Sequence, residues 1–371
     1  MEIVLKLGSL QALILSTLLF KRKSNNKANV YLSILVFLLG ALCLHYSYQS
    51  LDWFLKYPHL IRIDWGILLL FGPLLYLYTL RITKAKTSTA TLIISFIPYV
   101  LHLLVMMPFH LKSGESKILI LDYFTSTIAT GTDTYATYYI LLRVLIFTVS
   151  CYYSYVSIKV VNGYQSSLLH EYSDLDRLQL QWLKSLLIVF ILFSSVFLMT
   201  TIATYQDPYP LFDYDLYYFL GAFILIYVLS YKALGQPNIF IHQMDISAKE
   251  PQQERQSSSL TMLANKLKEF MKNDKPFLNG ELTATELANQ MDISRHQLSE
   301  ILNRELNASF YDYINILRIE EFKERVQSKK HEHLTLLAIA LDSGFNSKTT
   351  FNTFFKKATG LTPSQYKKSL K

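Results

Sequence analysis

The sequence predicts an all-α protein: a bundle of seven transmembrane helices followed by a soluble all-helical domain with two helix-turn-helix units. Three observations support this fold class. Apolar segments of membrane-spanning length fill the first 235 residues, whereas the remainder has the composition of an ordinary soluble domain. That remainder carries one helix-turn-helix pattern twice, offset by 52 residues. Charged residues make up only 17% of the 371 positions, below the soluble average of about 25%.

Seven apolar segments approach the about 20 residues that a helix needs to cross the hydrocarbon core of a bilayer. The third is the least regular, because Asp64 lies at its start. The first lacks a basic start and a small-residue cleavage site, so we expect it to be retained rather than removed as a signal peptide. A buried soluble core could also hold apolar helices, but the charges of the loops favour a membrane. The segments cover roughly residues 3–20, 30–48, 63–80, 92–111, 138–160, 183–203 and 216–234.

The loop charges predict how these helices are oriented. Loops after the first, third and fifth segments are rich in basic residues, and the alternate loops are poorer in them. Because basic residues favour the cytoplasmic side, the N-terminus is predicted outside and the C-terminus in the cytoplasm. This orientation requires an odd number of crossings, and seven is odd. The basic residues are Lys21, Arg22, Lys23, Lys27, Arg81, Lys84, Lys86, Lys159, Arg177 and Lys184.

A change in composition predicts the domain boundaries. Residues 1–235 form the membrane domain, and the sequence Gly235-Gln236-Pro237 would stop the seventh helix. Residues 236–259 become rich in Gln, Glu and Ser without an apolar period, which is typical of a flexible cytoplasmic linker. Residues 260–371 form the third part. The net charge of +8 for the whole chain suits nucleic acid or an anionic membrane surface as a partner.

The first helix-turn-helix unit is predicted between Thr283 and about Glu305. Thr283 can cap the first helix, with Glu286 completing a capping box. Asp292 falls at the tight turn, where a left-handed backbone is expected. Ser294 then caps the second helix, whose N-terminal half would enter the major groove of DNA. The residues on the outward face of that helix, which we predict to contact bases, are Arg295, His296, Gln297, Ser299 and Glu300.

The second unit repeats this pattern after a connecting helix over about Phe310–Gln327. Thr335 caps its first helix, Gly344 supplies the turn without strain, and Ser347 caps a helix that reaches about Ala358. The predicted DNA contacts at the exposed start of this helix are Lys348, Thr349, Asn352 and Thr353.

Residues from about 260 to 371 resemble the DNA-binding domain of the AraC/XylS family of bacterial regulators. The resemblance is carried by LTATELANQMDISRHQLSEILNRELNASFYDYINILRIEEFK and, more diagnostically, by LTLLAIALDSGFNSKTTFNTFFKKATGLTPSQYKK. It implies two helix-turn-helix units, bridged by a rigid helix, that read successive major-groove faces on one side of the duplex. Two positions depart from the family pattern. Asp292 replaces the usual turn glycine, and Glu300 stands where many members carry a basic residue, so it would accept from cytosine N4 or repel phosphate.

Residues 1–235 resemble, in architecture only, the multi-pass membrane sensors fused to such domains in Bacteroidetes-type bacteria. Within them Arg143 is the most informative residue, because a charge inside a membrane helix usually faces a cavity or the bundle interior. Asp64, and Asp213 or Asp215, would lie at a similar depth and could pair with it. Together with His45 and His102, Arg143 and Asp64 are our candidates for a pocket that binds a small, anionic ligand. The alternative is that Arg143 snorkels or makes a structural ion pair, and that the histidines only pack.

These features predict a bacterial inner-membrane transcription regulator that couples a signal sensed in the transmembrane domain to promoter binding. Its partners would be double-stranded DNA, the lipid bilayer and an unidentified signal, with RNA polymerase and a second copy of the chain as further candidates. The alternative is a membrane receptor or transporter whose helix-turn-helix domain serves only for protein contacts. The sequence shows no catalytic constellation, phosphate loop or metal-ligand spacing, so we expect no enzyme activity, cofactor or metal.

Overall fold

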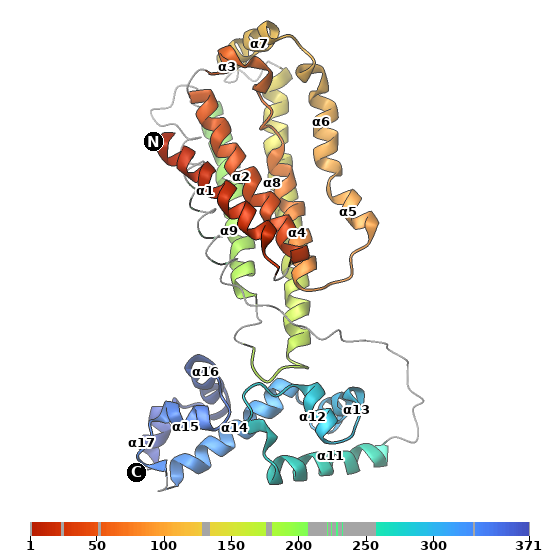
Figure 1. The fold of residues 1–371 in the computed structure, drawn as a ribbon, viewed down its shortest axis with the longest axis vertical. Helices are drawn as coiled ribbons and strands as arrows, with labels where there is room; N and C mark the ends of the chain where they lie inside the picture. The colour runs from red at the N-terminus through yellow and green to blue at the C-terminus, as the bar shows by residue number, and fades with distance from the viewer. Residues whose placement is uncertain are drawn as a thin grey trace. The chain divides into compact units, whose positions relative to one another are not determined.

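The computed structural model describes residues 2–23, 26–50, 53–127, 134–175, 180–206, 257–328 and 331–370, together with four single positions between 221 and 232. Every named element in these ranges is helical, and the one isolated bridge joins Tyr172 to Thr283. The predicted all-α class is therefore confirmed (Figure 1). The chain divides into two compact units: Met1–Asn162 with Leu180–Phe240, and Gly163–Gln179 with Ile241–Lys371.

The first unit contains several long, apolar helices. Within the described residues, five stretches are long and apolar enough to cross a membrane: Ile3–Lys21, Lys27–Tyr46, Thr89–His110, Thr137–Leu168 and Gln181–Thr200. They match the first, second, fourth, fifth and sixth predicted segments. The seventh, residues 216–234, lies outside the described residues apart from the single positions. The elements are α1 (Glu2–Lys21), α2 (Asn26–Ser50), α3 (Trp53–Lys56), η1 (Pro58–Leu60), η2 (Ile67–Leu70), α4 (Phe71–Ile82), α5 (Thr89–Ser95), α6 (Ile97–His110), α7 (Gly114–Thr127), α8 (Thr134–Leu168) and α9 (Gln181–Gln206).

The third predicted segment is helical later than expected, over Ile67–Ile82. The chain before it makes turns, and Gly66 has a φ of +82°. A Cβ at Gly66 would lie 2.4 Å from the ring of His102, so both the backbone and the space favour glycine. The helix consequently begins after Gly66. The resulting apolar helix is shorter than the about 20 residues of a typical span.

The helices α1 and α2 pack closely through small residues. A Cβ at Gly40 would lie 2.6 Å from Cβ of Ala12, and the Ser9 hydroxyl donates to the Gly40 carbonyl at 2.9 Å. Further along, the Ser33 hydroxyl donates to the carbonyl of Ser16 at 2.8 Å. Small residues and hydroxyl hydrogen bonds of this kind drive helix association in membranes, where burial of apolar surface gives no advantage.

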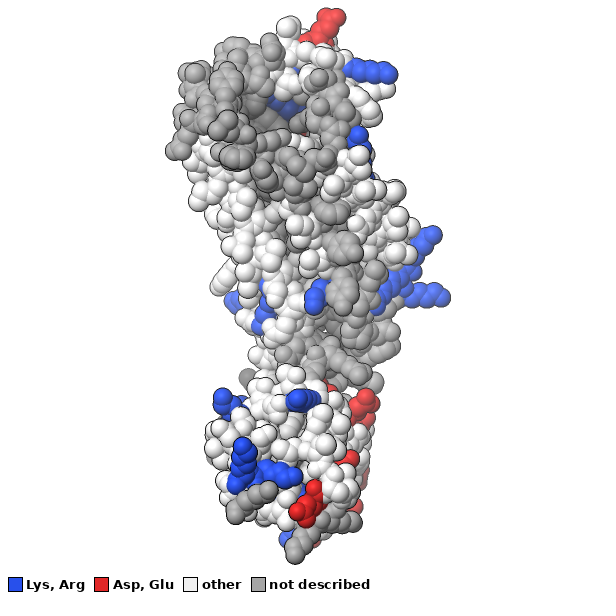
Figure 2. All heavy atoms as spheres, turned by 90° about the vertical axis from the view of Figure 1, so that its left-hand side faces the viewer, with Lys and Arg blue, Asp and Glu red and all other residues white. Residues whose placement is uncertain are grey.

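Large apolar side chains cover the outside of this unit. Exposed examples lie on α1, α6 and α9, among them Leu10, Leu104 and Leu192. Figure 2 shows that Lys and Arg side chains gather toward the two ends of this part, with white surface between them. Helices that are apolar on their exposed faces are typical of proteins embedded in lipid.

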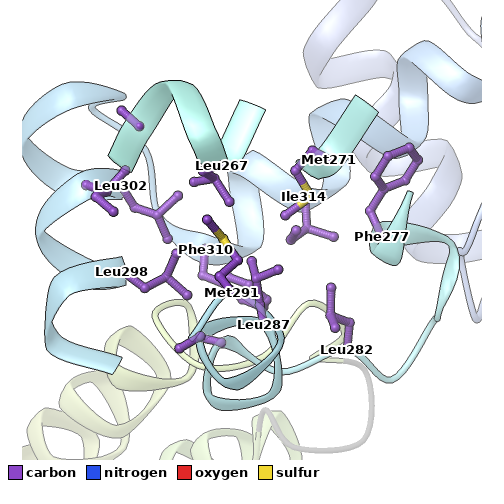
Figure 3. Packing of buried hydrophobic residues seen from close by; sticks show 14 of the residues in the cluster. Leu267, Met271, Phe277, Leu282, Leu287, Met291, Leu298, Leu302, Phe310 and Ile314 are labelled. Atoms are coloured by element: carbon purple, nitrogen blue, oxygen red, sulfur yellow. The ribbon is translucent and has the colours of Figure 1, made fainter. Parts of the chain in front are cut away.

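The second unit contains two small apolar cores joined by one helix. Its elements are α11 (Ser257–Asn273), η3 (Pro276–Leu278), α12 (Ala284–Gln290), α13 (Arg295–Glu300), a π-helical turn η4 (Ile301–Glu305), α14 (Phe310–Gln327), α15 (Leu336–Asp342), α16 (Lys348–Thr359) and α17 (Pro363–Ser369). The helix α14 contributes Phe310 and Ile314 to the first core, which Figure 3 shows, and Ile319 and Phe322 to the second. One continuous helix therefore carries both helix-turn-helix units.

Candidate nucleic-acid interface

The first helix-turn-helix unit consists of α12 and α13. Thr283 and Glu286 form the predicted capping box at the start of α12. Asp292 has a φ of +55°, the left-handed turn expected at this position. Ser294 caps α13, and the backbone amide of Ser294 donates to the side-chain oxygen of Gln297 at 2.8 Å. These local bonds fix the direction in which α13 leaves the turn.

The second unit consists of α15 and α16 and has the same local chemistry. The hydroxyl of Thr335 accepts from the amide of Ala338, and the hydroxyl of Ser347 accepts from the amide of Thr350. Gly344 makes the turn with a φ of +97°. A Cβ there would lie 2.5 Å from the carbonyl oxygen of Phe277, so glycine is required by contact as well as by backbone conformation.

The predicted contact residues of α16 all point outward. Lys348, Thr349, Asn352 and Thr353 are exposed, whereas Phe351, Phe354 and Phe355 are buried in the second core. The start of the helix therefore presents one cation, one amide and two hydroxyls on one polar surface. Amides pair with adenine, hydroxyls pair with several bases and lysine contacts phosphate or guanine.

The predicted contact residues of α13 are divided among different environments. His296 and Gln297 are exposed and Ser299 is half-buried. The Gln297 amide oxygen already accepts from the amide of Ser294. The guanidinium of Arg295 donates from Nε to Glu171 at 2.8 Å and from Nη2 to the carbonyl of His170 at 2.7 Å. Only part of this face is therefore available in the conformation observed.

Glu300 is placed differently from our expectation of an outward side chain. The structure buries it to 9% exposure, with one carboxylate oxygen 3.5 Å from Nη1 of Arg304. The regular helix α13 ends at Glu300, and the π-helical turn η4 follows it. Our expectation extended regular α-helical spacing as far as Glu305. A side chain so buried beside Arg304 is poorly placed to reach cytosine.

Arg318 on α14 has a structural role that we did not predict from the sequence. Its side chain is 1% exposed, and it donates to the carbonyls of Phe277, Asn279 and Ser173 at 2.8, 2.8 and 3.1 Å. Burial lowers the pKa of Arg318 to about 10, an effect that Asp174 opposes, so the side chain is charged at neutral pH. The signal in the sequence is an arginine on the apolar stripe of a helix, spaced at four residues from Ile314 and Phe322.

The lysines that could contact phosphate are mostly exposed. Lys356, Lys357 and Lys368 are exposed, Lys367 is half-buried, and Lys357 lies 3.4 Å from Asp312. The side-chain positions of Lys329 and Lys330 lie outside the described residues. Exposed lysines at the end of α16 and on α17 would add a sequence-independent attraction to phosphate that weakens with salt.

The four membrane candidates differ in the partners that their side chains contact. Arg143 is buried, donates to the carbonyl of Phe197 at 2.9 Å, and lies over the Phe197 ring. His102 Nδ1 lies 2.7 Å from the hydroxyl of Tyr138. His45 Nε2 lies 2.9 Å from the Asp64 carboxylate. The structure thus brings His45 and Asp64 together, but it places Asp64 with a histidine rather than with Arg143.

A cavity of about 640 Å³ lies beside the His45–Asp64 pair. Its walls are largely aromatic and aliphatic, and they include His45, Tyr48, Trp53 and Leu60. Lys6 is the other basic residue in the lining. Within the described residues no group of three or more potential metal ligands is found. Asp213 and Asp215, the other predicted partners of Arg143, lie outside the described residues.

Residues 287–369 match the family model described as a helix-turn-helix domain. No curated protein and no solved structure matches the chain. The matched range covers the second half of α12, all of α13 and α14, and the second unit. The C-terminal part of this chain is therefore a helix-turn-helix domain.

Proposed function

We propose that this chain is a membrane-integrated, AraC-type transcription regulator that binds promoter DNA through α13 and α16. The observation that carries this proposal is that one chain contains two capped helix-turn-helix units and, in the part that the structure describes, five apolar stretches of membrane-spanning length. The family match supports DNA binding by the C-terminal part. The exposed polar side chains at the start of α16 provide the chemistry that base recognition requires.

The positions of charged loops support the orientation. Basic residues predict that the segment between α8 and α9 is cytoplasmic. That same segment, Gly163–Gln179, belongs to the compact unit that contains both helix-turn-helix units. DNA and the helix-turn-helix units would then share the cytoplasm, at the inner membrane of a bacterium. In this arrangement residues 236–259 act as a cytoplasmic linker, as their composition predicts.

For signal sensing, we favour the cavity beside His45 and Asp64. Its mostly apolar walls suit an apolar ligand that carries one polar or acidic group, which His45 or Lys6 would bind. We assign packing roles to Arg143 and His102, because neither is among the residues that line this cavity and each contacts a protein group. Replacing His45 with Gln should change expression of a reporter gene that the protein controls, without changing the amount of the protein in the membrane. Unaltered output over all growth conditions tested would count against this cavity.

The DNA-binding function is tested by mapping genome-wide occupancy of the full-length, tagged protein at its native level. The variant Lys348→Ala/Asn352→Ala removes two exposed side chains of α16, and Lys268→Ala on exposed α11 controls for loss of a charge. We expect discrete sites that persist in the control and disappear in the double variant. Sites that survive in the double variant, or no sites in the wild type, would favour a receptor or transporter whose C-terminal domain binds only proteins.

A further inference from the structure

The segment between α8 and α9 is bound to the surface of the helix-turn-helix units. Backbone hydrogen bonds hold it at three points. The carbonyl of Glu171 accepts from Ala284 at 2.8 Å, the amide of Ser173 donates to Leu282 at 3.4 Å, and the carbonyl of Leu169 accepts from Tyr311 at 3.0 Å. These partners lie at α12 and α14, so the segment runs along both elements.

Side chains of the segment add specific contacts. Glu171 is the most connected: Oε1 accepts from the hydroxyl of Thr285 at 2.6 Å, and Oε2 accepts from Arg295 at 2.8 Å. At the other end, Asp174 accepts from the side-chain amide of Asn346 at 2.7 Å. Asn346 follows the turn of the second unit. One short acidic segment therefore contacts both helix-turn-helix units.

Ser173 lies in the centre of this contact. It is 1% exposed. Its carbonyl accepts from Arg318 at 3.1 Å and from Asn315 at 3.2 Å, and its hydroxyl donates to Leu282 at 2.7 Å. The buried Arg318 thereby gains two acceptors from Ser173, because Nη2 also donates to the serine hydroxyl at 3.1 Å. The burial of Ser173 and its hydrogen bonds show that the segment and the surface beneath it are complementary.

The contact occupies a residue that we predict to read DNA. Arg295 uses Nε and Nη2, one complete edge of its guanidinium, for Glu171 and the carbonyl of His170. The bidentate pairing of arginine with guanine needs two N–H groups on one edge. Arg295 cannot give this edge to Glu171 and to a base together. The carboxylates of Glu171 and Asp174 would also repel phosphates brought close to this surface.

From these contacts we propose that residues 168–174 form an inhibitory docking segment that competes with DNA for Arg295 and the surface around it. The inference rests on the proposed DNA-binding function. Because α8 leads into the segment and α9 follows it, a movement of these two helices would pull on the segment through the backbone. Release of the segment would free Arg295 and both helix-turn-helix units, so a signal in the membrane reaches the DNA-binding surface without passing through residues 236–256.

The first test weakens the docking without altering any predicted DNA contact. The full-length variant Glu171→Ala/Asp174→Ala, in lipid nanodiscs, is titrated with a duplex carrying the most strongly occupied sequence from the genome-wide map. If about nine tenths of the wild-type molecules are in the docked form, loss of docking lowers the apparent Kd for DNA by about tenfold. The control Glu269→Ala/Asp342→Ala removes the same charge from exposed positions elsewhere on the unit. Binding equal to or weaker than that of the control would overturn the proposal.

A second test locks the segment in place, and it remains decisive if the first variant is poorly folded. Cysteines replace Asp174 and Asn346, whose side chains are in contact, and a short, reducible cross-linker joins them. We expect the linked protein to lose at least about nine tenths of its DNA binding and to regain it on reduction, as population shift requires. Single-cysteine variants control for Cys43 and Cys151. Equal binding by the linked and reduced forms would refute inhibition.

The two proposals fail in different ways. If wild type, docking variant and Lys348→Ala/Asn352→Ala all give no occupied sites, the DNA-binding function itself is wrong. If the wild type binds DNA through α16 but neither the docking variant nor the cross-link alters that binding, only the inhibitory segment is wrong. The segment would then be a permanent structural support of the unit.

Discussion

The replacement of Gly344 by alanine tests how the second helix-turn-helix unit is held against the first. Gly344 has a φ of +97°, and a Cβ there would lie 2.5 Å from the carbonyl oxygen of Phe277 and 2.9 Å from Nε of Arg318. The chain offers a matched control in Gly360, which has a φ of +74° but no atom within 4 Å of an added Cβ. The control isolates backbone strain from contact.

The two substitutions should differ in magnitude. A left-handed backbone costs a residue with a Cβ about 1–2 kcal/mol, and this is the whole expected effect of Gly360→Ala. Gly344→Ala adds an overpacking cost of about 1–3 kcal/mol, because a backbone oxygen cannot move aside as a flexible side chain does. Their difference corresponds to about fivefold to hundredfold in the local opening equilibrium.

Hydrogen exchange of the full-length protein measures both effects on one reporter, because α16 lies between the two glycines. All three tryptophans, Trp53, Trp65 and Trp182, lie outside the helix-turn-helix domain, so their fluorescence would not report on it. We expect α16 peptides to exchange faster in Gly344→Ala than in Gly360→Ala, by at least about fivefold. Equal rates in the two variants would show that the Phe277 carbonyl does not approach position 344.

Three further predictions concern charge and local stability. Lys348→Ala should weaken binding to a duplex that carries one of the occupied sequences. It should also reduce the slope of log binding constant against log salt concentration by about one, measured by titrations at several salt concentrations. Burial alone would raise the pKa of Glu321, but hydrogen bonds from Lys275 and Arg325 lower it overall. The stabilisation that ionised Glu321 gives the folded state is therefore complete above the ordinary pKa of 4.5, and it is lost as the pH falls through the lowered pKa. In thermal melts, the stability of Glu321→Gln should fall less steeply with decreasing pH than that of the wild type. Gly163 has open space around an added Cβ, so Gly163→Ala should stabilise the end of α8 by about 0.5–1 kcal/mol, visible as slower exchange there.

The helix-turn-helix units could be predicted because their signals are local. Each of the four helices begins after a residue whose hydroxyl accepts from one of the first free backbone amides, and these capping residues are Thr283, Ser294, Thr335 and Ser347. The turns at Asp292 and Gly344 follow from the same short-range rules. Apolar helices could also be recognised from composition alone, since length and hydropathy identify them.

The contacts that organise the candidate site could not be predicted, because their partners are distant in the chain. Glu171 meets Arg295, and Ser173 meets Arg318, across more than a hundred residues. Neither partner carries a local motif that identifies the other. The burial of Glu300 was missed for another reason: Glu300 lies in the regular part of α13, and helical spacing alone does not show which residues pack against that helix.

Our central proposal is that the membrane-embedded chain itself binds DNA. It is tested most directly by cross-linking DNA in cells to a protein tagged at both ends, followed by purification through each tag in turn. Only an intact chain passes both steps. We predict that the same discrete DNA sites are recovered from the membrane fraction after both purifications. Recovery of DNA only through the C-terminal tag, on a shorter product, would contradict the claim and indicate release by proteolysis within residues 249–259.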